Sequence, residues 1–483
     1  MEKSIIRKIL LYGIICPLFF MACSHKGQTW EIKGVTSTFE KPWVDITTVE
    51  NDDENLEAIE VSIKCDSLGD PIIGFGACFN ELGWAAISQL SDKDKEIIFD
   101  ELFNPETGGN FNLNRLPLGA NDFSLDYYSF DETPNDFELK DFSLSHDDST
   151  LVPFIKEALK RNPEMKLWAS PWCPPKWMKR NNHYAMVPAW PGGVDNDLQP
   201  DQIGYEGQDM FIMEDKYLET YAQYFGKFID AYKERGINIF MVMPQNEFNS
   251  AQPYPACCWT AEGLGRFIAK LGPVMDEKNV ETWLGTVERA NISLIDTIMS
   301  NPEAAKYIKG VGFQWAGKDA LPLVAEKYPE LKLMQTEQVC GDGSNDIKMW
   351  ETAWNLMNFY LKGGAVAYDY WNIALEKGGV SRWGWSQNSL IVVDKETKSF
   401  SFTPEYYMMK HFSHFLPSGS KIIKSIEGDT ENIIAFSLPD NSLILIAANF
   451  TDKDKNLKFK IENKEQNQFL QKMSVTTLQL KNL

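Results

Sequence analysis

Eight short apolar runs recur along this sequence, and a stretch with helical periodicity follows each of them. The runs are Ile72–Phe79, Phe111–Leu118, Lys166–Trp172, Ile239–Asn246, Thr282–Glu288, Val311–Trp315, Leu331–Glu337 and Ala365–Trp371. Amphipathic stretches between them, such as 91–103, 215–235 and 346–361, have the spacing of surface helices. A strand followed by a helix, eight times over, is typical of a (β/α)8 barrel. We therefore predict an α/β fold whose functional site lies at the C-terminal ends of the strands.

The pattern changes beyond about residue 415, where short strand-like runs alternate with turn signals. Residues 416–483 are therefore predicted to form a β-sandwich beside the barrel, and the barrel is assigned to residues 71–415. The N-terminal segment 23–70 is expected to contribute strands to the same sandwich. The predicted fold is thus a TIM barrel with a side β-sandwich, built from the C-terminal strands and this N-terminal segment.

The first residues have the features of an export signal. A basic start is followed by an apolar run, residues 9–20, which is too short to span a bilayer. The run ends in Phe20-Met21-Ala22-Cys23, the pattern of a bacterial lipoprotein signal. We expect residues 1–22 to be removed and Cys23 to be lipidated, so that the protein is exported and membrane contact occurs only through the anchor. The alternative is an ordinary signal peptide with an incidental cysteine.

The charge balance restricts the partners of this chain. The 483 residues carry a formal net charge of −21, which repels nucleic acid and anionic lipid headgroups. A neutral substrate suits this surface better than a phosphorylated one, and no nucleic-acid partner is expected. The chain also contains 15 Trp, a residue that stacks on the apolar faces of sugar rings when core packing does not use it.

Two carboxylates end two of the apolar runs. Glu247 follows Asn246 at the end of one run, and Glu337 ends another. Retaining glycoside hydrolysis requires such a pair, one carboxyl protonated as general acid and the other ionised as nucleophile. Asn246 could bond the 2-hydroxyl of a sugar. The alternative is that these residues only cap helices at strand–helix junctions.

Further polar residues follow the same strand ends. Arg115 ends the second run, where it could keep a nucleophilic carboxylate ionised, and Asp122 could hold two sugar hydroxyls. The alternative is that Arg115 and Asp122 merely pair with each other. Glu288 is a third strand-end carboxylate, for which a salt bridge with Arg289 or another arginine is at least as good an explanation as substrate contact.

Several tryptophans are candidates for substrate contact. Trp172 lies in a proline-rich loop that fixes its position, while Trp315 and Trp371 stand where their strands meet the upper face of the barrel. Trp383 and Trp385 follow the eighth run in a glycine-rich segment that could approach a ligand closely. Core packing is the alternative for each of them.

Other chemistries find little support. The five histidines form no zinc-protease motif, no serine-hydrolase motif is present, and Gly74-Phe75-Gly76 lacks the third glycine of a dinucleotide fingerprint. No metal and no cofactor are predicted. The cysteines that follow Cys23 form no C-x-x-C pair and are expected to be mostly buried thiols.

At these residues the chain resembles glycoside hydrolase family 30, which includes glucosylceramidases and microbial β-1,6-glucanases. The resemblance spans about residues 74–420. Its landmarks are Gly74-Phe75-Gly76, Arg115-Leu116-Pro117, Ala169-Ser170-Pro171-Trp172, Asn246-Glu247, Thr336-Glu337, Tyr370-Trp371-Asn372-Ile373-Ala374-Leu375 and His411-Phe412-Ser413-His414-Phe415. The family fold is a barrel with a side β-sandwich, as the patterns above predict.

The resemblance implies roles for single residues. It implies Glu247 as acid/base and Glu337 as nucleophile, and the sugar-binding positions of the family fall on Asp122, Trp172, Asn246 and Trp371. Gln314-Trp315-Ala316 departs from the His-Trp-Tyr of glucosylceramidases, and Arg382-Trp383-Gly384-Trp385 is closer to the β-1,6-glucanase branch.

We therefore expect a retaining β-glycosidase that acts on β-linked glucosides. Its partner would be a carbohydrate or glycolipid substrate: β-1,6-glucan oligomers, a glucosylceramide-like lipid or another short β-glycoside. The alternative is a non-catalytic glycan-binding lipoprotein of the cell surface.

Overall fold

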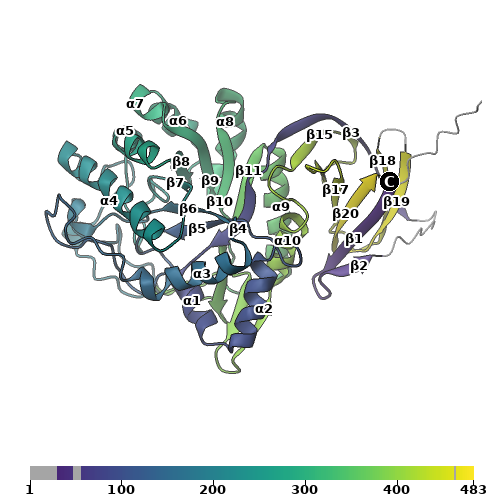
Figure 1. Ribbon diagram of the computed structural model, residues 1–483, viewed down its shortest axis with the longest axis horizontal. Helices are drawn as coiled ribbons and strands as arrows, with labels where there is room; N and C mark the ends of the chain where they lie inside the picture. Colours follow the sequence, from purple (N-terminus) through teal and green to yellow (C-terminus); the bar gives the residue numbers. More distant parts are fainter. Residues whose placement is uncertain (1–29, 47–55, 462–463, 483) are drawn as a thin grey trace, which may run out of the picture.

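The eight predicted strands close into a parallel barrel in the computed structural model, which describes residues 30–46, 56–461 and 464–482 (Figure 1). The barrel strands are β4 (Gly74–Cys78), β5 (Leu113–Pro117), β6 (Lys166–Ser170), β7 (Met241–Val242), β8 (Glu281–Val287), β9 (Ile308–Gln314), β10 (Lys332–Glu337) and β11 (Ala365–Asn372). Strand β11 pairs with β4 and completes the ring. The predicted fold class is confirmed.

Helices surround the barrel on its outside (Figure 1). They are α1 (Glu81–Ser88), α2 (Asp92–Phe103), α3 (Leu151–Arg161), α4 (Asp215–Glu234), α5 (Ala261–Glu277), α6 (Ile292–Met299), α7 (Pro302–Ala305), α8 (Leu321–Lys327), α9 (Ile347–Lys362) and α10 (Pro404–Ser413). Their starts follow from the sequence: the side chains of Ser91, Thr260 and Asp346 each accept a hydrogen bond from a backbone N–H in the first turn of α2, α5 and α9. Among the described residues, no helix combines the length and apolar character needed to cross a membrane.

The barrel interior is filled by side chains rather than open. A separate buried cluster, contributed by most of the strands, comprises Leu113, Trp168, Met241, Met243, Trp283, Met334, Val366 and Ala367. Gly76 is required beside it, because a Cβ there would lie 1.7 Å from the carbonyl oxygen of Leu113 on the neighbouring strand. The packed interior leaves the strand ends as the place for a site.

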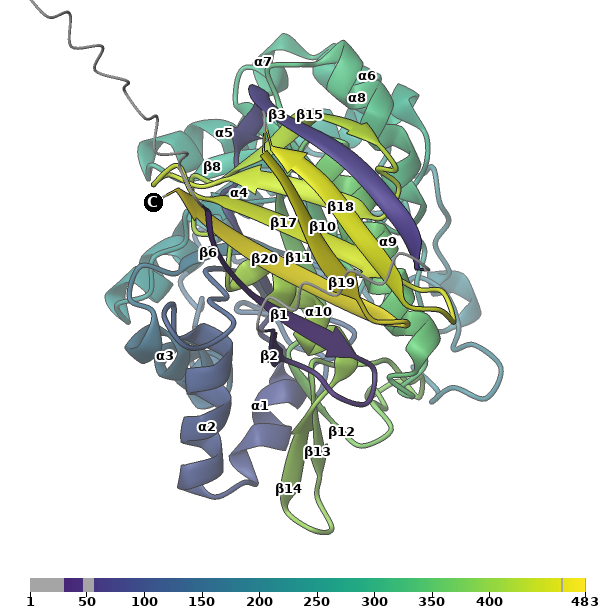
Figure 2. The ribbon, with the colours of Figure 1, turned by 90° about the vertical axis from the view of Figure 1, so that its right-hand side faces the viewer.

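A second domain lies beside the barrel as one nine-stranded sheet (Figure 2). Its strands, in spatial order, are β19 (Lys464–Leu470), β18 (Lys455–Ile461), β3 (Glu57–Pro71), β15 (Lys421–Gly428), β16 (Ile433–Ser437), β17 (Leu443–Asn449), β20 (Ser474–Asn482), β1 (Trp30–Thr38) and β2 (Val44–Ile46). The sheet curls so that β19 contacts β17 and β20 across an apolar core. The side domain is therefore a single curled sheet that combines strands from both ends of the sequence, with β3 inserted among C-terminal strands and β1 and β2 at one edge.

The two domains share part of their core. One face of β17 points Ile444 and Ile446 into the apolar cluster that also holds the barrel helices, while Leu443 and Leu445 face the interior of the curled sheet. This is the alternation expected of a strand that is covered on both faces. The chain passes from β3, which ends at Pro71, directly into the barrel strand β4.

A small sheet not expected from the sequence follows the eighth barrel strand. It consists of β12 (Ala374–Glu376), β13 (Ile391–Asp394) and β14 (Ser399–Phe402). The segment between β12 and β13 carries Trp383 and Trp385 toward the upper end of the barrel, where a cleft opens.

Candidate active site

A cleft of about 480 Å³ lies at the C-terminal ends of the barrel strands. Its lining includes both predicted catalytic residues, Glu247 and Glu337, together with Asp122, Asn246 and Glu288. Glu337 is the last residue of β10, and Glu247 follows β7. Strand β7 pairs with its neighbours over only Met241–Val242, so it is much shorter than the predicted run 239–246. The residues just before Glu247 leave the sheet and build the cleft instead.

Arg115 on β5 makes an ion pair with Glu337. Its Nη1 lies 2.7 Å from Oε2 of Glu337, and its side chain is fully buried. The guanidinium also stacks over the ring of Trp172, 4.2 Å from the ring centroid, and donates to the hydroxyl of Ser170. The aromatic ring and the carboxylate together fix the position of the guanidinium charge. Arg115 thus pairs with Glu337, which differs from the alternative of pairing with Asp122.

Asn246 connects the two glutamates through its amide oxygen. The Oδ1 atom accepts from Arg115 Nη2 at 2.7 Å, from Thr286 Oγ1 at 3.0 Å and from Gln314 Nε2 at 3.3 Å. With its oxygen occupied, the amide NH2 of Asn246 is the group left to meet a ligand oxygen in the cleft.

Glu247 is held only by neutral donors. Its Oε1 accepts from Gln314 Nε2 at 3.1 Å, and its Oε2 accepts from Gln252 Nε2 at 3.3 Å and from the hydroxyl of Tyr254 at 3.4 Å. Its backbone φ is +44°, a region that few non-glycine residues adopt. The backbone N–H of Glu247 donates to Thr286 Oγ1 at 2.8 Å, which helps to keep this conformation in place.

Burial raises the pKa of both glutamates. For Glu337 burial raises it to about 7, with Arg115 acting against burial and the nearby charge of Glu247 adding to it. For Glu247 burial also raises the pKa, opposed first by the hydrogen bond from Gln314. Two close carboxyls do not readily ionise together. The guanidinium contacts Glu337 directly, so it stabilises the ionised form of Glu337, whereas Glu247 has no such ion pair in the described structure.

Asp122 and two tryptophans lie near the Arg115 side of the cleft. Asp122 lines the cleft, and its Oδ1 has no hydrogen-bond partner among the described residues. Trp172 also lines the cleft and stacks on Trp371 with ring centroids 5.3 Å apart. Trp371 is buried behind it, and its indole N–H meets no partner in the described part of the chain.

The remaining predicted tryptophans separate into two groups. Trp315, which is 39% exposed with φ +48°, and Trp385 line the cleft. Trp383 lies behind Trp385, with ring centroids 6.4 Å apart, and is only 3% exposed. Its indole N–H donates to the hydroxyl of Tyr127 at 3.1 Å. The structure therefore places Trp383 as a support for Trp385 rather than on the cleft wall.

Sequence reasoning missed several cleft residues that come from loops. Tyr254 and Gln252 follow Glu247 in a loop, and Trp190 packs against Trp385 with ring centroids 5.1 Å apart. The prolines around Tyr254 and Trp190 are the signal that could have indicated rigid, functional loops. Gln314, which contacts Glu247, stands at a strand end within a motif already singled out.

Glu288 has neither of the partners considered for it from the sequence. Arg289 makes its ion pair with Glu206 instead, and Glu288 Oε1 accepts only the backbone N–H of Asn249 at 3.2 Å. The other carboxyl oxygen, Oε2, has no partner among the described residues. Burial raises the pKa of Glu288 to about 8, and the charge of Glu247 is the next contribution.

No metal centre is found in the described ranges. No group of three or more His, Cys, Asp or Glu there is arranged to hold an ion. Cys78, Cys173, Cys257, Cys258 and Cys340 are buried thiols. Cys23 lies outside the residues that the structure describes.

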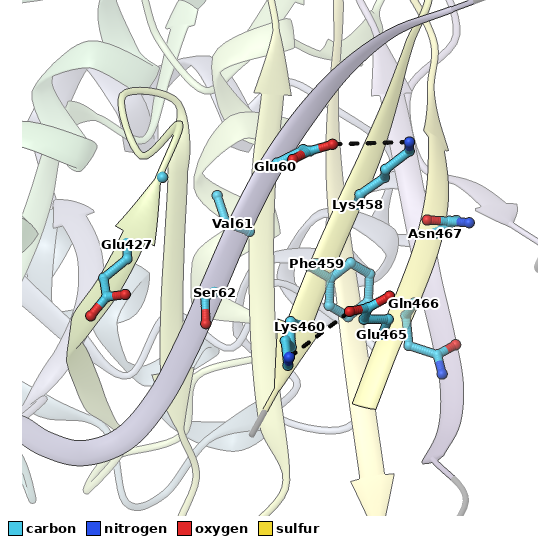
Figure 3. Close-up of a pocket in the computed structure, with 11 residues that line it drawn as sticks. Glu60, Val61, Ser62, Glu427, Lys458, Phe459, Lys460, Glu465, Gln466 and Asn467 are labelled. Carbon is cyan, nitrogen blue, oxygen red and sulfur yellow. Dashed lines mark ion pairs between the residues drawn. The ribbon is translucent and has the colours of Figure 1, made fainter. Parts of the chain in front are cut away.

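The side domain contains a different groove, of about 370 Å³, between β3, β15, β18 and β19 (Figure 3). Two ion pairs cross between its strands, Lys458 with Glu60 and Lys460 with Glu465, each at 3.9 Å. Its one aromatic ring, Phe459, is buried in the sheet core. The groove thus lacks the opposed carboxyls and exposed aromatic rings of the barrel cleft.

A (β/α)8 barrel with paired buried carboxyls at its C-terminal end defines the class of TIM-barrel glycoside hydrolases. The family model described as "Glycosyl hydrolase family 30 TIM-barrel domain" matches residues 72–416. The chain therefore belongs to glycoside hydrolase family 30, as its motifs predicted.

Similar proteins in this family include enzymes named as glucosylceramidases and as endo-1,6-beta-D-glucanases. The chain is 28% identical to lysosomal acid glucosylceramidase of Mus musculus, over 79% of this chain and 75% of the relative. It is 23% identical to an endo-1,6-beta-D-glucanase of Neurospora crassa, over 78% of both chains. The crystal structure of SrfJ from Salmonella typhimurium superposes with a TM-score of 0.80 at 21% identity, covering 94% of this chain and all of that chain. The similarity to SrfJ supports the fold alone.

Proposed function

We propose that this protein hydrolyses β-linked glucosides with retention of configuration, using Glu337 as nucleophile and Glu247 as acid/base. The observation that carries the proposal is the unequal environment of the two glutamates. Glu337 bonds the buried guanidinium of Arg115, whereas the carboxyl of Glu247 accepts from Gln314, Gln252 and Tyr254 and from no cation among the described residues. An ionised carboxylate can attack the anomeric carbon while a protonated one donates to the leaving oxygen.

In the second half of the reaction, Glu247 removes a proton from water. That water then attacks the glycosyl–Glu337 ester and releases the sugar with its original configuration. Asn246, whose amide NH2 is free in the described structure, would bond the sugar near the reacting carbon. Asp122 and Trp172, on the same side of the cleft as Arg115, would hold the rest of the glycone.

Glucose is the proposed glycone because the two groups of relatives carry names of enzymes for glucosylceramide and β-1,6-glucan. Both β-1,6-glucan oligomers and a glucosylceramide-like lipid are therefore candidate substrates. A non-catalytic glycan-binding protein is the competing function, and no feature of the cleft favours it.

The direct test is the stereochemistry of hydrolysis. The protein should hydrolyse 4-nitrophenyl β-glucoside, and proton NMR should detect β-glucose before mutarotation produces the α-anomer. Initial release of α-glucose would contradict the retaining mechanism. Absence of hydrolysis on aryl β-glucosides and on β-1,6-, β-1,3- and β-1,4-linked glucans would instead favour the glycan-binding alternative.

We also propose that the protein is exported and lipid-anchored through Cys23, a proposal that rests on the Phe20-Met21-Ala22-Cys23 pattern. A Cys23→Ala variant, expressed in a bacterium, should move from the membrane to the soluble fraction. Mass spectrometry should find an acylated N-terminal cysteine in the parent protein and none in the variant. Unchanged membrane association of the variant, with no acyl group on the parent, would refute the anchor.

A further inference from the structure

We propose that Glu288 is a specificity-determining residue that binds a hydroxyl group of the leaving group, so that the preferred leaving group is a sugar. This inference rests on the function proposed above, because it takes Glu247 as the acid that protonates the leaving oxygen. It assigns a role to a carboxyl that the hydrolytic mechanism itself does not use.

Glu288 lies at the end of β8 with one half of its carboxyl satisfied. Only 2% of the residue is exposed, yet it lines the cleft. Oε1 accepts the backbone N–H of Asn249, and Oε2 has no protein partner in the described ranges. A buried polar atom without a partner is unfavourable and is rarely retained unless a ligand or water satisfies it.

The nearest cation does not neutralise Glu288 by direct contact. The guanidinium of Arg289 bonds Glu206 and the hydroxyl of Ser250 instead. Burial is the largest cause that raises the pKa of Glu288, and it acts on a carboxyl that has no cation in direct contact among the described residues. Oε1 is already the acceptor for Asn249, so Oε2 is the oxygen that can bond a sugar hydroxyl, as acceptor when the carboxyl is ionised and as donor when it is protonated.

Its neighbours place Glu288 on the leaving-group side of the cleft. Gln252 donates both to Glu247 and to Ser250, and Arg289 donates to the same Ser250 hydroxyl. These residues therefore form a polar patch around the acid/base.

An aromatic wall lines the same cleft as this polar patch. Trp385 packs against Tyr254 and Trp190, with ring centroids 4.9 Å and 5.1 Å apart. A sugar ring has apolar faces and a polar edge, so it can stack on such a wall while its hydroxyls meet Glu288. A glucosylceramide-like lipid would offer Glu288 only the hydroxyl and amide close to the glycosidic oxygen, and its acyl chains would gain nothing from this polar patch.

The test compares leaving groups that do and do not carry hydroxyls. Glu288→Leu should lower kcat/KM on the best β-linked glucose disaccharide about tenfold, the size expected for one lost hydrogen bond. On 4-nitrophenyl β-glucoside, whose leaving group has no sugar hydroxyls, the change should stay within about twofold of the parent. Glu288→Gln keeps an acceptor for Asn249 and a donor toward the cleft, so it should retain most of the disaccharide activity. Glu326→Leu, on the exposed side of α8, is the matched control and should behave as the parent.

A binding measurement keeps the test independent of turnover. In a Glu337→Gln background, calorimetry should show about tenfold weaker binding of the disaccharide when Glu288→Leu is added, and unchanged binding of methyl β-glucoside. Equal losses on both ligands, or no loss on either, would overturn the assignment of Glu288. If the parent protein hydrolyses no β-glucoside at all, the proposed function fails. The affinities of the Glu337→Gln protein for the disaccharide and for methyl β-glucoside, with and without Glu288→Leu, still decide the role of Glu288.

Discussion

Arg115 makes the two cleft glutamates chemically unequal, although burial acts on both in the same direction. Its guanidinium lies 2.7 Å from Glu337 and 2.7 Å from the amide oxygen of Asn246. The residue beside Asn246, Glu247, receives neutral hydrogen bonds and no direct ion pair in the described structure. One buried cation therefore favours the ionised form of one carboxyl over that of the other, on which the proposed roles of the two glutamates rest.

Loss of the nucleophile should nearly abolish activity. Glu337→Gln should lower kcat at least about 10⁴-fold, because no glycosyl-enzyme can form without the carboxylate. In Glu337→Gly, added azide should enter the vacated space and produce α-glucosyl azide, which NMR identifies. Near-normal turnover of Glu337→Gln would exclude this residue as nucleophile.

Loss of the acid/base should depend on the leaving group. Glu247→Ala should lose about 10²–10⁴-fold in activity on a disaccharide, whose leaving oxygen needs protonation. The loss should be far smaller on a dinitrophenyl glucoside, whose leaving group departs without it. With the activated substrate a burst should appear, because water attacks the ester slowly without a base. Azide should then accelerate turnover and give β-glucosyl azide; an α-azide from this variant would mean that the two roles are reversed.

At the scale of elements, the loops after the strands decide which side chains meet a ligand. The segment between β12 and β13 places Trp385 on the cleft wall and Trp383 behind it. Gly384 between them has φ +96°, and a Cβ there would lie 3.2 Å from the backbone nitrogen of Val194, whose N–H donates to the carbonyl of Trp383, so the loop closes against a neighbouring loop. Trp383 and Trp385, two residues apart in the sequence, therefore differ in position: one packs behind the cleft wall and the other forms part of it.

The two tryptophans should respond differently to truncation. Trp385→Ala should raise KM about 2- to 10-fold on oligosaccharides, the value of one stacking contact, and less on a small aryl glucoside. Trp383→Ala removes a buried ring and should lower the free energy of unfolding by about 3–5 kcal/mol. Steady-state kinetics and urea unfolding of both variants separate these effects. A stability loss for Trp385→Ala as large as that for Trp383→Ala would mean that both rings serve only the core.

For the whole molecule, the contact between barrel and side domain includes a buried histidine beside the shared apolar core. His411 on α10 bonds Ser37 of β1 and Thr477 of β20, each at 2.8 Å. Burial lowers its pKa to about 3, with Lys410 adding to the effect. The residue therefore stays neutral in the folded protein and joins strands from the two ends of the sequence to the barrel.

The pH dependence of stability follows from that lowered pKa. Below pH 6.5 the unfolded chain binds a proton at His411 that the folded chain does not, so stability falls as pH falls toward 3. The loss from this residue is about 2 kcal/mol at pH 5. His411→Gln should have a lower free energy of unfolding than the parent at pH 7. Between pH 7 and pH 5 its free energy of unfolding should fall by less than that of the parent, as measured by urea unfolding. An identical pH slope in the parent and the variant would show that His411 is not responsible.

The sequence by itself determined the features that depend on local pattern. Periodicity identified the eight strands and the helices between them, and the change of pattern near residue 415 identified the second domain. The C-terminal ends of the strands in a parallel barrel meet at one face. The sequence pattern alone therefore predicts that polar residues there, such as Glu247 and Glu337, lie close together, as they do in the cleft.

Only the tertiary structure decided which groups face one another. Arg115 and Glu337 are 222 positions apart in the sequence, and Glu288 was equally compatible with an arginine partner that it does not have. Likewise, nothing local distinguishes Trp383 from Trp385 or shows that one curled sheet, rather than two, builds the side domain. Hydrogen-bond partners, burial and the resulting pKa shifts depend on atoms from distant segments, and a residue's own neighbours in the chain do not specify them.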